Sequence, residues 1–427
     1  MDIVNIKPAM LEGEVRIPPS KSIAHRAVIA AFLSGGKCSI ENIDLSDDIF
    51  ATVGCIKAMG AKCRYDKKSR ILEVSCEKLK STSRRITLDC GESGSTLRFF
   101  IPIALALGFK CNFTGRGRLM KRPMEPYMKV FEEKGVKYEL KDDVLTTDGK
   151  LTAGKYIIDG SLSSQFVTGL LFALSTLEGD SEIVIDGETV SRGYIDLTLA
   201  TLEDFGIEVE NKDYKQFIIK GNQKYKVMDY SVEGDFSQAA FFLVAGAIGS
   251  NVVCTGMNPD SIQGDKEILN VLERAGATVK IEDGGRIQAQ YNADMHGITV
   301  DAGEIPDLVP ILAVLLSFCR GESRIVNAGR LRIKESDRLK AVSSELKHLG
   351  VDITEGADYL KINGRHVLEG TTVSAWNDHR IAMSMAIAAC RCEGDVGITG
   401  AQVAVKKSYP DFFEDYKSLG GKVESCK

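Results

Sequence analysis

The sequence contains few of the residues that mark specialised protein classes. Its 427 residues include one Trp and ten Pro, and its eleven Cys form no CxxC pair. The closest spacing is Cys390-Arg391-Cys392, which lacks any zinc-site pattern. These absences argue against a zinc-binding module and a disulfide scaffold. We therefore expect the cysteines to be small buried side chains in a reducing compartment, with no metal bound.

Long apolar runs and an excess of positive charge are also absent. No charged-then-apolar leader opens the chain, and no apolar run approaches the length that spans a bilayer. The net charge is −5 and the isoelectric point is near 5.8, which argues against a general nucleic-acid-binding protein. The composition, 44% hydrophobic and 26% charged, predicts a globular cytoplasmic protein with no nucleic-acid and no membrane partner.

The sequence does contain a long-period repeat. An apolar residue followed four positions later by Gly, at the end of a predicted helix, recurs along the whole chain. The glycines are Gly60, Gly135, Gly206, Gly276, Gly350 and Gly420, spaced by 75, 71, 70, 74 and 70 residues. Each Gly is predicted to end a helix in the left-handed conformation and to lead into a strand. Six occurrences at this regularity predict six copies of one structural repeat.

Each glycine is preceded by a segment of almost uniform hydrophobicity. These segments are residues 27–33, 99–107, 166–177, 239–248, 308–318 and 381–390. Helices with this composition are buried on all sides rather than amphipathic. We interpret each repeat as strand–helix–strand–helix–strand, with buried helices inside and sheets outside. The predicted fold class is therefore α/β (α+β).

Domain borders are inferred from the repeats, because no Pro-rich or Ser-rich linker divides the chain. Six repeats divide into two domains of three repeats each. The first domain is predicted at residues 20–233, and the second at residues 1–19 and 234–427. The chain would cross between the domains twice, near residues 18–21 and 232–235. Pro18-Pro19 predicts a stiff, extended segment at the first crossing.

Cationic residues cluster where several helices are predicted to begin. Lys21, His25 and Arg26 follow Pro18-Pro19-Ser20, and Arg380 follows Asn377-Asp378-His379. A helix N-terminus already carries partial positive charge, so Lys and Arg are mildly disfavoured there. Repeated cations at this place predict that a multiply charged anion binds beside them.

Other repeats carry further groups suited to anions. The glycines of the loop 91–94 would expose backbone N–H groups, with Arg98 on the following turn. Residues 118–123 form a basic loop, and Ser163-Ser164-Gln165 offers hydroxyl and amide groups. Lys334 and Arg338 stand four apart with Glu335 between them. Fixed donors of complementary charge are what phosphate recognition requires.

Each of these patterns also has a purely structural interpretation. Lys21, Arg26 and Arg338 could be solvated surface charges, and Ser163 could be a simple helix cap. For Asp235 with Gln238 we favour the structural interpretation, a capping box. His25 and His379 could be core histidines or could support the site from a second layer, and both possibilities stay open.

Seven ordered motifs resemble those of the 5-enolpyruvylshikimate-3-phosphate synthase family, over essentially the whole chain. They lie at residues 18–26, 118–123, 163–165, 305–307, 334–338, 377–380 and 407–410. The resemblance implies a two-domain inside-out α/β barrel with three repeats in each domain. It implies transfer of the enolpyruvyl group of phosphoenolpyruvate to the 5-hydroxyl of shikimate 3-phosphate through a tetrahedral intermediate, in the shikimate pathway of aromatic amino-acid biosynthesis. It implies no cofactor, and we expect a monomer.

The resemblance also implies the site residues. Phosphoenolpyruvate would be surrounded by Lys21, Gly94, Arg122, Gln165, Arg338, Arg380 and Lys407. Shikimate 3-phosphate would be held by Lys21, Ser22, Arg26, Ser163, Ser164, Gln165, Ser191, Tyr194, Asp307 and Lys334. The chemistry needs a general base and a general acid. Asp307 is the candidate for accepting the hydroxyl proton, and Glu335 or Lys21 for protonating the methylene carbon.

Three positions depart from the family pattern. Glu92 stands where the family often has Asn, Phe99 replaces a frequent Pro, and Arg330 replaces an Asn that helps to hold shikimate 3-phosphate. Arg330 could pair with phosphate or with Glu335. Glu92 places a carboxylate near an anion site, which bears on the affinity for phosphoenolpyruvate and on glyphosate sensitivity.

Two other functions stay open. The sister enzyme that transfers enolpyruvyl to UDP-N-acetylglucosamine usually carries a Cys where Gly117 stands here. A non-catalytic sensor of a phosphorylated metabolite would not need the acid–base residues Asp307 and Glu335. Phosphate release with each acceptor would separate the three hypotheses.

Overall fold

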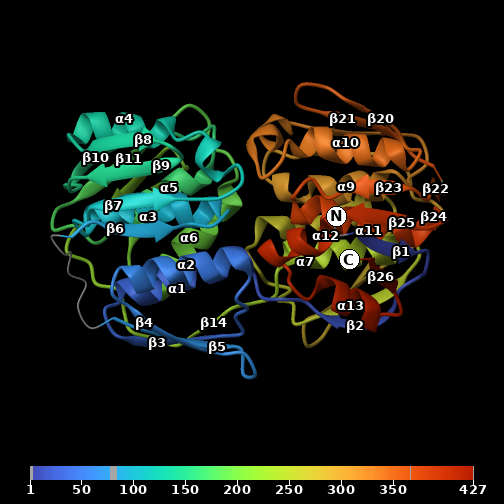
Figure 1. The fold of residues 1–427 in the computed structure, drawn as a ribbon, viewed down its shortest axis with the longest axis horizontal. Coiled ribbons are helices and arrows are strands. Elements are labelled where there is room, and N and C mark those ends of the chain that lie inside the picture. The colour runs from blue at the N-terminus through green and yellow to red at the C-terminus, as the bar shows by residue number, and fades with distance from the viewer. Residues whose placement is uncertain (1–2, 77–83, 366, 427) are drawn as a thin grey trace. The chain divides into compact units, whose positions relative to one another are not determined.

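The structure, a computed structural model, describes residues 3–76, 84–365 and 367–426 (Figure 1). Contacts divide the chain into two compact units. Unit 1 comprises Met1–Ser20 and Glu233–Lys427, and unit 2 comprises Lys21–Val232. The described part of the chain forms six four-stranded sheets, three in each unit, and one two-stranded sheet in unit 1.

Unit 2 contains three similar repeats of helices and strands. The first has α1 (Lys21–Leu33), α2 (Asp47–Ala58), β3 (Lys37–Glu41), β4 (Lys62–Asp66), β5 (Ile71–Ser75) and β14 (Tyr230–Ser231). The second has α3 (Gly94–Ala106), the short 3-10 helix η1 (Leu119–Lys121), α4 (Glu125–Lys134), β6 (Ile86–Asp89), β7 (Cys111–Thr114), β8 (Lys137–Lys141) and β9 (Val144–Asp148). The third has α5 (Ser164–Leu174), α6 (Arg192–Asp204), β10 (Gly154–Asp159), β11 (Ser181–Asp186), β12 (Val209–Lys212) and β13 (Gln216–Ile219).

Unit 1 follows the same plan. Its first repeat has α7 (Phe236–Ala247), η2 (Gly264–Glu267), α8 (Ile268–Arg274), β2 (Glu12–Arg16), β15 (Asn251–Thr255), β16 (Thr278–Glu282) and β17 (Arg286–Gln290). Its second has η3 (Pro306–Leu308), α9 (Val309–Leu316), η4 (Gly329–Ile333), α10 (Arg338–His348), β18 (Thr299–Asp301), β19 (Glu322–Val326), β20 (Asp352–Glu355) and β21 (Leu360–Asn363). Its third has α11 (His379–Ala388), η5 (Ala389–Arg391), α12 (Ala401–Ala404), η6 (Val405–Lys407), α13 (Phe412–Ser418), β1 (Ile3–Lys7), β23 (Thr372–Ser374), β25 (Val396–Thr399) and β26 (Lys422–Cys426), and β22 (Leu368–Glu369) pairs with β24 (Cys392–Glu393).

Each four-stranded sheet combines one parallel pair with two antiparallel pairings, and the outer antiparallel pair is a hairpin in every sheet except the one where β1 pairs with β26. In the second repeat of unit 2, β6 and β7 are parallel, while β9 pairs antiparallel with β7 and with β8. The predicted repeat had only three strands, and this prediction was wrong by one strand. In the second repeat of unit 2, the strand after Gly135 returns through a tight turn: Asp142 and Asp143 both adopt positive φ between β8 and β9. That two-residue turn is the usual hairpin geometry, and the spacing of helix-ending glycines carries no signal for it.

The uniformly apolar helices form the cores, as predicted. In unit 2, α3 packs on α5, and in unit 1, α7, α9 and α11 pack on one another. Every residue of α7, α9 and α11 is buried, and in α5 only Gln165 is not. The first of these helices ends at Leu33 as predicted, and the other five end slightly before the predicted limits; α11, for example, ends at Ala388 and continues as η5. Burial on all sides explains why these helices lack a polar face.

The six repeat glycines all adopt positive φ, between 66° and 106°, which confirms their predicted left-handed conformation. The capping box predicted at Asp235 is only half formed. The Asp235 carboxylate accepts hydrogen bonds from the backbone N–H groups of Ser237 and Gln238. The Gln238 side chain instead donates to Ser408 Oγ at 2.6 Å, because the hydroxyl is brought to it by a segment 170 residues away.

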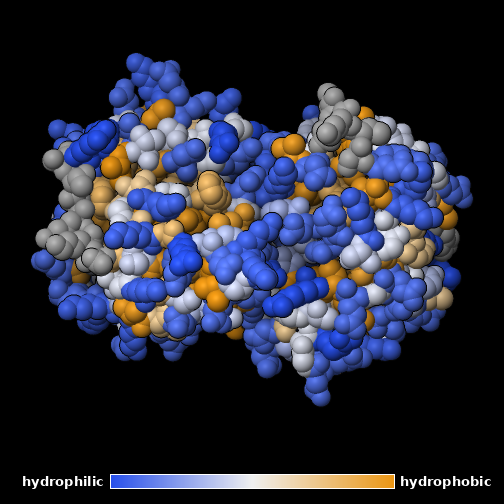
Figure 2. Space-filling view, turned by 60° about the horizontal axis from the view of Figure 1, so that its bottom comes forward, coloured by the Kyte–Doolittle hydropathy of each residue, from blue (hydrophilic) through white to orange (hydrophobic). Residues whose placement is uncertain are grey.

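Polar side chains cover most of the face seen in Figure 2, with apolar residues interspersed. Among the ten cysteines whose side chains the structure describes, nine are buried and none forms a disulfide bond, as expected for small core side chains. In the described ranges, no helix is long and apolar enough to cross a bilayer.

Candidate functional site

The predicted site residues divide between the two units. Unit 1 contains Asp307, Lys334, Glu335, Arg338, Arg380 and Lys407, and unit 2 contains Lys21, Ser22, Arg26, Gly94, Arg122, Ser163, Ser164, Gln165, Ser191 and Tyr194. Most of them lie at or just before the first turn of a helix. These positions expose backbone N–H groups that have no partner within the helix.

Asp307 lies at the centre of a cluster of cations in unit 1. Its Oδ1 accepts a hydrogen bond from Arg338 Nη1 at 2.8 Å and lies 3.6 Å from Lys334 Nζ. Its Oδ2 accepts a hydrogen bond from Arg380 Nη2 at 3.1 Å, and its backbone oxygen accepts one from Arg380 Nη1 at 3.0 Å. We call Asp307, Lys334, Glu335, Arg338 and Arg380 the Asp307 cluster.

The two arginines of the cluster are held by a buried carboxylate, Asp378. Arg338 Nε donates to Asp378 Oδ2 at 2.8 Å, and Asp378 Oδ1 caps α11 by accepting the Arg380 N–H at 2.9 Å. Arg338 Nη2 lies 2.7 Å from Glu335 Oε2. Arg338 and Arg380 are only 1% and 4% exposed, so the surface-charge interpretation of Arg338 is wrong.

The electrostatics of the cluster keep Asp307 ionised. Burial by itself would raise the pKa of Asp307, but Arg380, Lys334 and Arg338 together hold it well below its ordinary value. Burial lowers the pKa of Lys334, although the charge of Asp307 opposes this effect. Nearby, burial and the charge of Asp307 raise the pKa of Asp265 to about 6. Asp307 in the cluster and Asp265 beside it are thus two neighbouring carboxyl groups whose pKa values are shifted in opposite directions.

Lys407 lies beside the same cluster. Its Nζ donates to the backbone oxygen of Asn377 at 2.6 Å. Trp376 and Asn377 both adopt positive φ, which costs conformational energy in residues other than Gly and is typical of functional sites. Arg330 donates to the backbone oxygen of Gly303. This bond anchors Arg330 to the loop that precedes Asp307.

In unit 2, the helix α1 carries Lys21 and Arg26. Lys21 Nζ forms a 2.8 Å ion pair with Asp48 at the start of α2. Arg26 is 2% exposed, so it is not a surface charge either, and burial lowers its pKa to about 10. Its guanidinium donates to Thr198 Oγ1 at 2.9 Å and to the backbone oxygens of Ser22 and Tyr194 at 2.6 and 2.7 Å. Arg26 therefore ties two predicted substrate-binding residues together.

The start of α3 brings three more predicted residues together. A side chain at Gly94 would place its Cβ 2.7 Å from Arg122 Nη1 and 3.4 Å from Gln165 Oε1, so Gly94 leaves room for both groups. Gln165 also bonds Arg98 Nη1 at 2.7 Å and Ser95 Oγ at 3.0 Å. We call Gly94, Arg122 and Gln165 the Gly94 cluster.

The remaining predicted residues lie at the starts of α5 and α6. Ser163 is the N-cap of α5 and accepts the Gln165 N–H at 3.3 Å, which confirms its capping role. Ser164 is buried in the first turn of this helix. Ser191 precedes α6 with a φ of 54°, which is unusual for a residue other than Gly.

The site residues implied by the resemblance do not include three residues that the structure places in contact with them. Asp48 pairs with Lys21, Arg98 pairs with Gln165, and Asp378 holds Arg338. Asp378 belongs to a motif that was recognised, but its position in the sequence did not show which cation it faces. The partners are 27, 67 and 40 residues apart, so only the fold could pair them.

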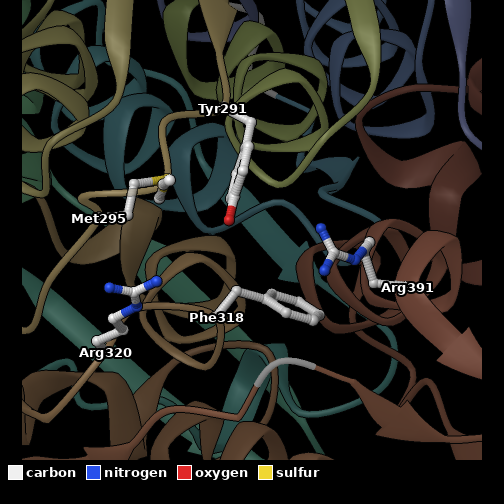
Figure 3. Close-up of a pocket in the computed structure, with 6 residues that line it drawn as sticks. Tyr291, Met295, Phe318, Arg320 and Arg391 are labelled. Atoms are coloured by element: carbon white, nitrogen blue, oxygen red, sulfur yellow. The ribbon is translucent and has the colours of Figure 1, made fainter.

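A small hollow in unit 1 lies elsewhere (Figure 3). It encloses about 280 Å³, including its open side, and is lined by Tyr291, Ala293, Met295, Phe318, Arg320 and Arg391. The Arg391 guanidinium lies 5.6 Å from the centre of the Phe318 ring and 6.0 Å from that of Tyr291. Arg391 follows Arg380 by eleven residues, roughly 16 Å along a helix. The hollow is therefore at the opposite end of α11 from the Asp307 cluster.

The geometry of each unit is that of an anion-binding protein. Buried guanidinium groups beside helix N-termini suit ligands with phosphate and carboxylate groups. A carboxylate among them can accept a proton. In the part of the chain that the structure describes, no group of three or more His, Cys, Asp or Glu could hold a metal ion.

Comparisons with known proteins identify the family. The family model for EPSP synthase (3-phosphoshikimate 1-carboxyvinyltransferase) matches residues 6–416. The 3-phosphoshikimate 1-carboxyvinyltransferase of Clostridium novyi is 49% identical over 435 residues, covering 99% of each chain. That of Clostridium beijerinckii is 48% identical over 431 residues, covering 99% of this chain and 98% of the relative. The chain belongs to the EPSP synthase family.

Solved structures show the same fold. An EPSP synthase from Acinetobacter baumannii has a TM-score of 0.83 at 25% identity, with both chains fully covered. The enolpyruvyl transferase NikO from Streptomyces tendae has a TM-score of 0.81 at 18% identity, covering 100% of this chain and 99% of NikO, and supports the fold alone. The matches confirm the predicted family, fold class and 3-phosphoshikimate 1-carboxyvinyltransferase activity.

Proposed function

We propose that this protein transfers the enolpyruvyl group of phosphoenolpyruvate to the 5-hydroxyl of shikimate 3-phosphate with the two sets of residues described above. The Asp307 cluster carries the proposal, because it joins an ionised carboxylate to Lys334, Arg338 and Arg380. Both substrates are multiply anionic, and their phosphate and carboxylate groups can replace Asp307 as partners of these cations.

Phosphoenolpyruvate is assigned to residues from both units. Arg338, Arg380 and Lys407 would contact it from unit 1, and Lys21 with the Gly94 cluster would contact it from unit 2. The assignment requires the two units to bring these sets to one ligand.

Shikimate 3-phosphate is assigned mainly to unit 2, through Ser22, Ser163, Ser164, Gln165, Ser191 and Tyr194, with Asp307 and Lys334 from unit 1. Arg26 supports this set, since its bonds to the backbone oxygens of Ser22 and Tyr194 orient both residues. Its near-complete burial suits a role in holding the site together, with any contact to phosphate coming from its remaining N–H groups.

The proton transfers are assigned to the acidic and basic residues. Asp307 takes the proton of the 5-hydroxyl while that oxygen bonds to the central carbon of phosphoenolpyruvate. Glu335 or Lys21 adds a proton to the methylene carbon, which gives the tetrahedral intermediate. The intermediate then loses a proton from the new methyl group and expels phosphate. When substrate anions pair with Arg338 and Arg380, the pKa of Asp307 rises, and this makes it a stronger base.

The acceptor is assigned to shikimate 3-phosphate rather than UDP-N-acetylglucosamine. In the sister family a Cys usually stands at the position of Gly117, whose φ here is 61°. A Cβ at Gly117 would lie 2.6 Å from Glu92 Oε2, so a side chain there would displace Glu92. The arrangement around Gly117 favours the shikimate acceptor.

Phosphate release tests the proposal directly. The purified protein is incubated with phosphoenolpyruvate and either shikimate 3-phosphate or UDP-N-acetylglucosamine, and phosphate is measured. We expect release only with shikimate 3-phosphate. Release with UDP-N-acetylglucosamine would support the sister activity, and release with neither would support the sensor. We also propose that the protein acts in the cytoplasm and that it is a monomer. Light scattering coupled to gel filtration would test whether it is a monomer.

A further inference from the structure

Four buried side chains form a hydrogen-bonded chain between three helices of unit 2. His25 Nδ1 in α1 lies 2.7 Å from Thr52 Oγ1 in α2, which lies 2.7 Å from Thr96 Oγ1 in α3. Thr96 Oγ1 donates to Ser93 Oγ at 2.8 Å, and Ser93 is the N-cap of α3. None of the four residues is more than 1% exposed. Buried polar groups this well connected hold their helices in one arrangement.

The hydrogen bonds of this side-chain network all run in one direction, from His25 as the first donor to Ser93 as the last acceptor. Ser93 Oγ accepts from both the N–H and the hydroxyl of Thr96, at 3.1 and 2.8 Å. A hydroxyl has a single hydrogen, so Thr96 must accept from Thr52, and Thr52 must accept from His25 Nδ1–H. His25 Nε2 is buried and makes no hydrogen bond, as suits an unprotonated ring nitrogen better than an N–H group. Burial, together with the charges of Lys21 and Arg26, lowers the pKa of His25 well below its ordinary value, so the ring is neutral.

The hydrogen-bonded network ends beside residues assigned to phosphoenolpyruvate. Ser93 immediately precedes Gly94, the first residue of α3. Thr96 Oγ1 also lies 3.4 Å from the backbone oxygen of Asp48, whose side chain holds Lys21. The same hydroxyl thus contacts the turn before Gly94 and the residue that positions Lys21.

We propose that His25, Thr52 and Thr96 are positioning residues that fix the start of α3 and Lys21 in the orientation that binds phosphoenolpyruvate. The proposal rests on the proposed function. Ser93 sets the direction of the backbone N–H groups in the first turn of α3 by capping the helix, and such groups, which have no partner within a helix, are directional anion donors. The packing of His25 edge-on against Phe99, with ring centres 6.4 Å apart, keeps the imidazole aimed at Thr52.

Valine substitutions remove the hydroxyls while preserving side-chain shape. We expect T52V and T96V to raise the KM for phosphoenolpyruvate about tenfold, with kcat changed less than about threefold and the KM for shikimate 3-phosphate nearly unchanged, because small misplacements of binding groups are costly. T52S keeps the hydroxyl and should behave like the wild type. T201V is the matched control, since Thr201 is a buried threonine of the same unit whose hydroxyl donates only to Leu197 O within its own helix.

Two kinetic outcomes would overturn the proposal. The first is a KM for phosphoenolpyruvate in T52V and T96V that changes no more than in T201V. The second is a T52S variant as impaired as T52V, since packing rather than the hydroxyl would then be responsible. A merely structural role predicts a lower melting temperature without this selective rise in KM.

Nitrogen NMR of the histidine rings tests the chain without relying on activity. The signals of His25 are identified by their loss in H25Q. We expect the neutral tautomer protonated at Nδ1, unchanged between pH 6 and 8, and an altered Nδ1 shift in T52V. A ring protonated at Nε2, or one that titrates in this range, would overturn the proposal. A wild-type protein without phosphate release would refute the proposed function, whereas the ring signals would still decide the hydrogen-bond chain.

Discussion

Arg338 and Asp378 form a buried ion pair, with Arg338 Nε 2.8 Å from Asp378 Oδ2 and side chains that are 1% and 0% exposed. The pair leaves Nη1 of Arg338 directed at Asp307. Asp378 also accepts a bond from Ser336 Oγ at 3.0 Å. A cation with this many fixed partners cannot move freely, so the Asp307 cluster is already organised before any substrate anion arrives.

Replacing Arg338 by Lys should destabilise unit 1. Lysine keeps the charge but cannot reach Asp378, Asp307 and Glu335 at the same time, so buried carboxylates lose their partners. Breaking a buried pair in this way costs about 3–5 kcal/mol. Differential scanning calorimetry should show a clearly lower melting temperature. R324K, at an exposed arginine, is the control and should change little. An R338K melting temperature equal to that of R324K would contradict this expectation.

Replacing Asp307 by Ala should remove the general base. We expect kcat to fall by a factor on the order of 10² to 10⁴, with little change in the affinity for shikimate 3-phosphate. Steady-state kinetics and calorimetric titration of shikimate 3-phosphate measure the two quantities. D283A, at an exposed aspartate, serves as the control. Near-normal turnover in D307A would remove the role assigned to Asp307.

Replacing Asp265 by Asn should stabilise the protein at neutral pH and not at pH 4. The pKa of Asp265 is raised to about 6 in the folded protein, against about 3.9 in an unfolded chain. A raised carboxyl pKa favours folding below pH 4, and this contribution is lost as the pH rises through 6. Asn stays neutral, so its advantage should grow to at most roughly 3 kcal/mol between these values.

Thermal unfolding of D265N and the wild type from pH 4 to 7.5 measures this effect. The difference between their melting temperatures should be small at pH 4 and should widen toward pH 7. D283N should show no such trend, because Asp283 is exposed. A difference that is constant with pH would show that the pKa of Asp265 is not raised in the folded protein.

Local features of the fold were predictable because they depend on near neighbours. The repeat glycines show positive φ because a helix must end there, and residues within one turn decide this. The buried helices follow from their own composition. The return strand at Asp142-Asp143 was also local, and it was missed because the repeat was defined by glycines alone.

The partners of the charged residues were not predictable in this way. Motifs indicated Lys21, Asp307 and Arg338, yet nothing near Lys21 in the sequence showed that Asp48 would pair with it. Asp307 and Arg380 are 73 residues apart, and Thr52 and Thr96 are 44 apart. Such pairs form only when separate repeats pack against each other.

The sequence by itself determined the six-fold repeat, the buried helices and the identity of the charged groups at their starts, since spacing and composition are properties of the chain alone. Tertiary structure decided which carboxylate faces which cation and which hydroxyl reaches His25. The pKa of a group depends on how deeply it is buried and on its distance from other charges. These two properties, and the hydrogen bonds between repeats, exist only after distant repeats have packed together.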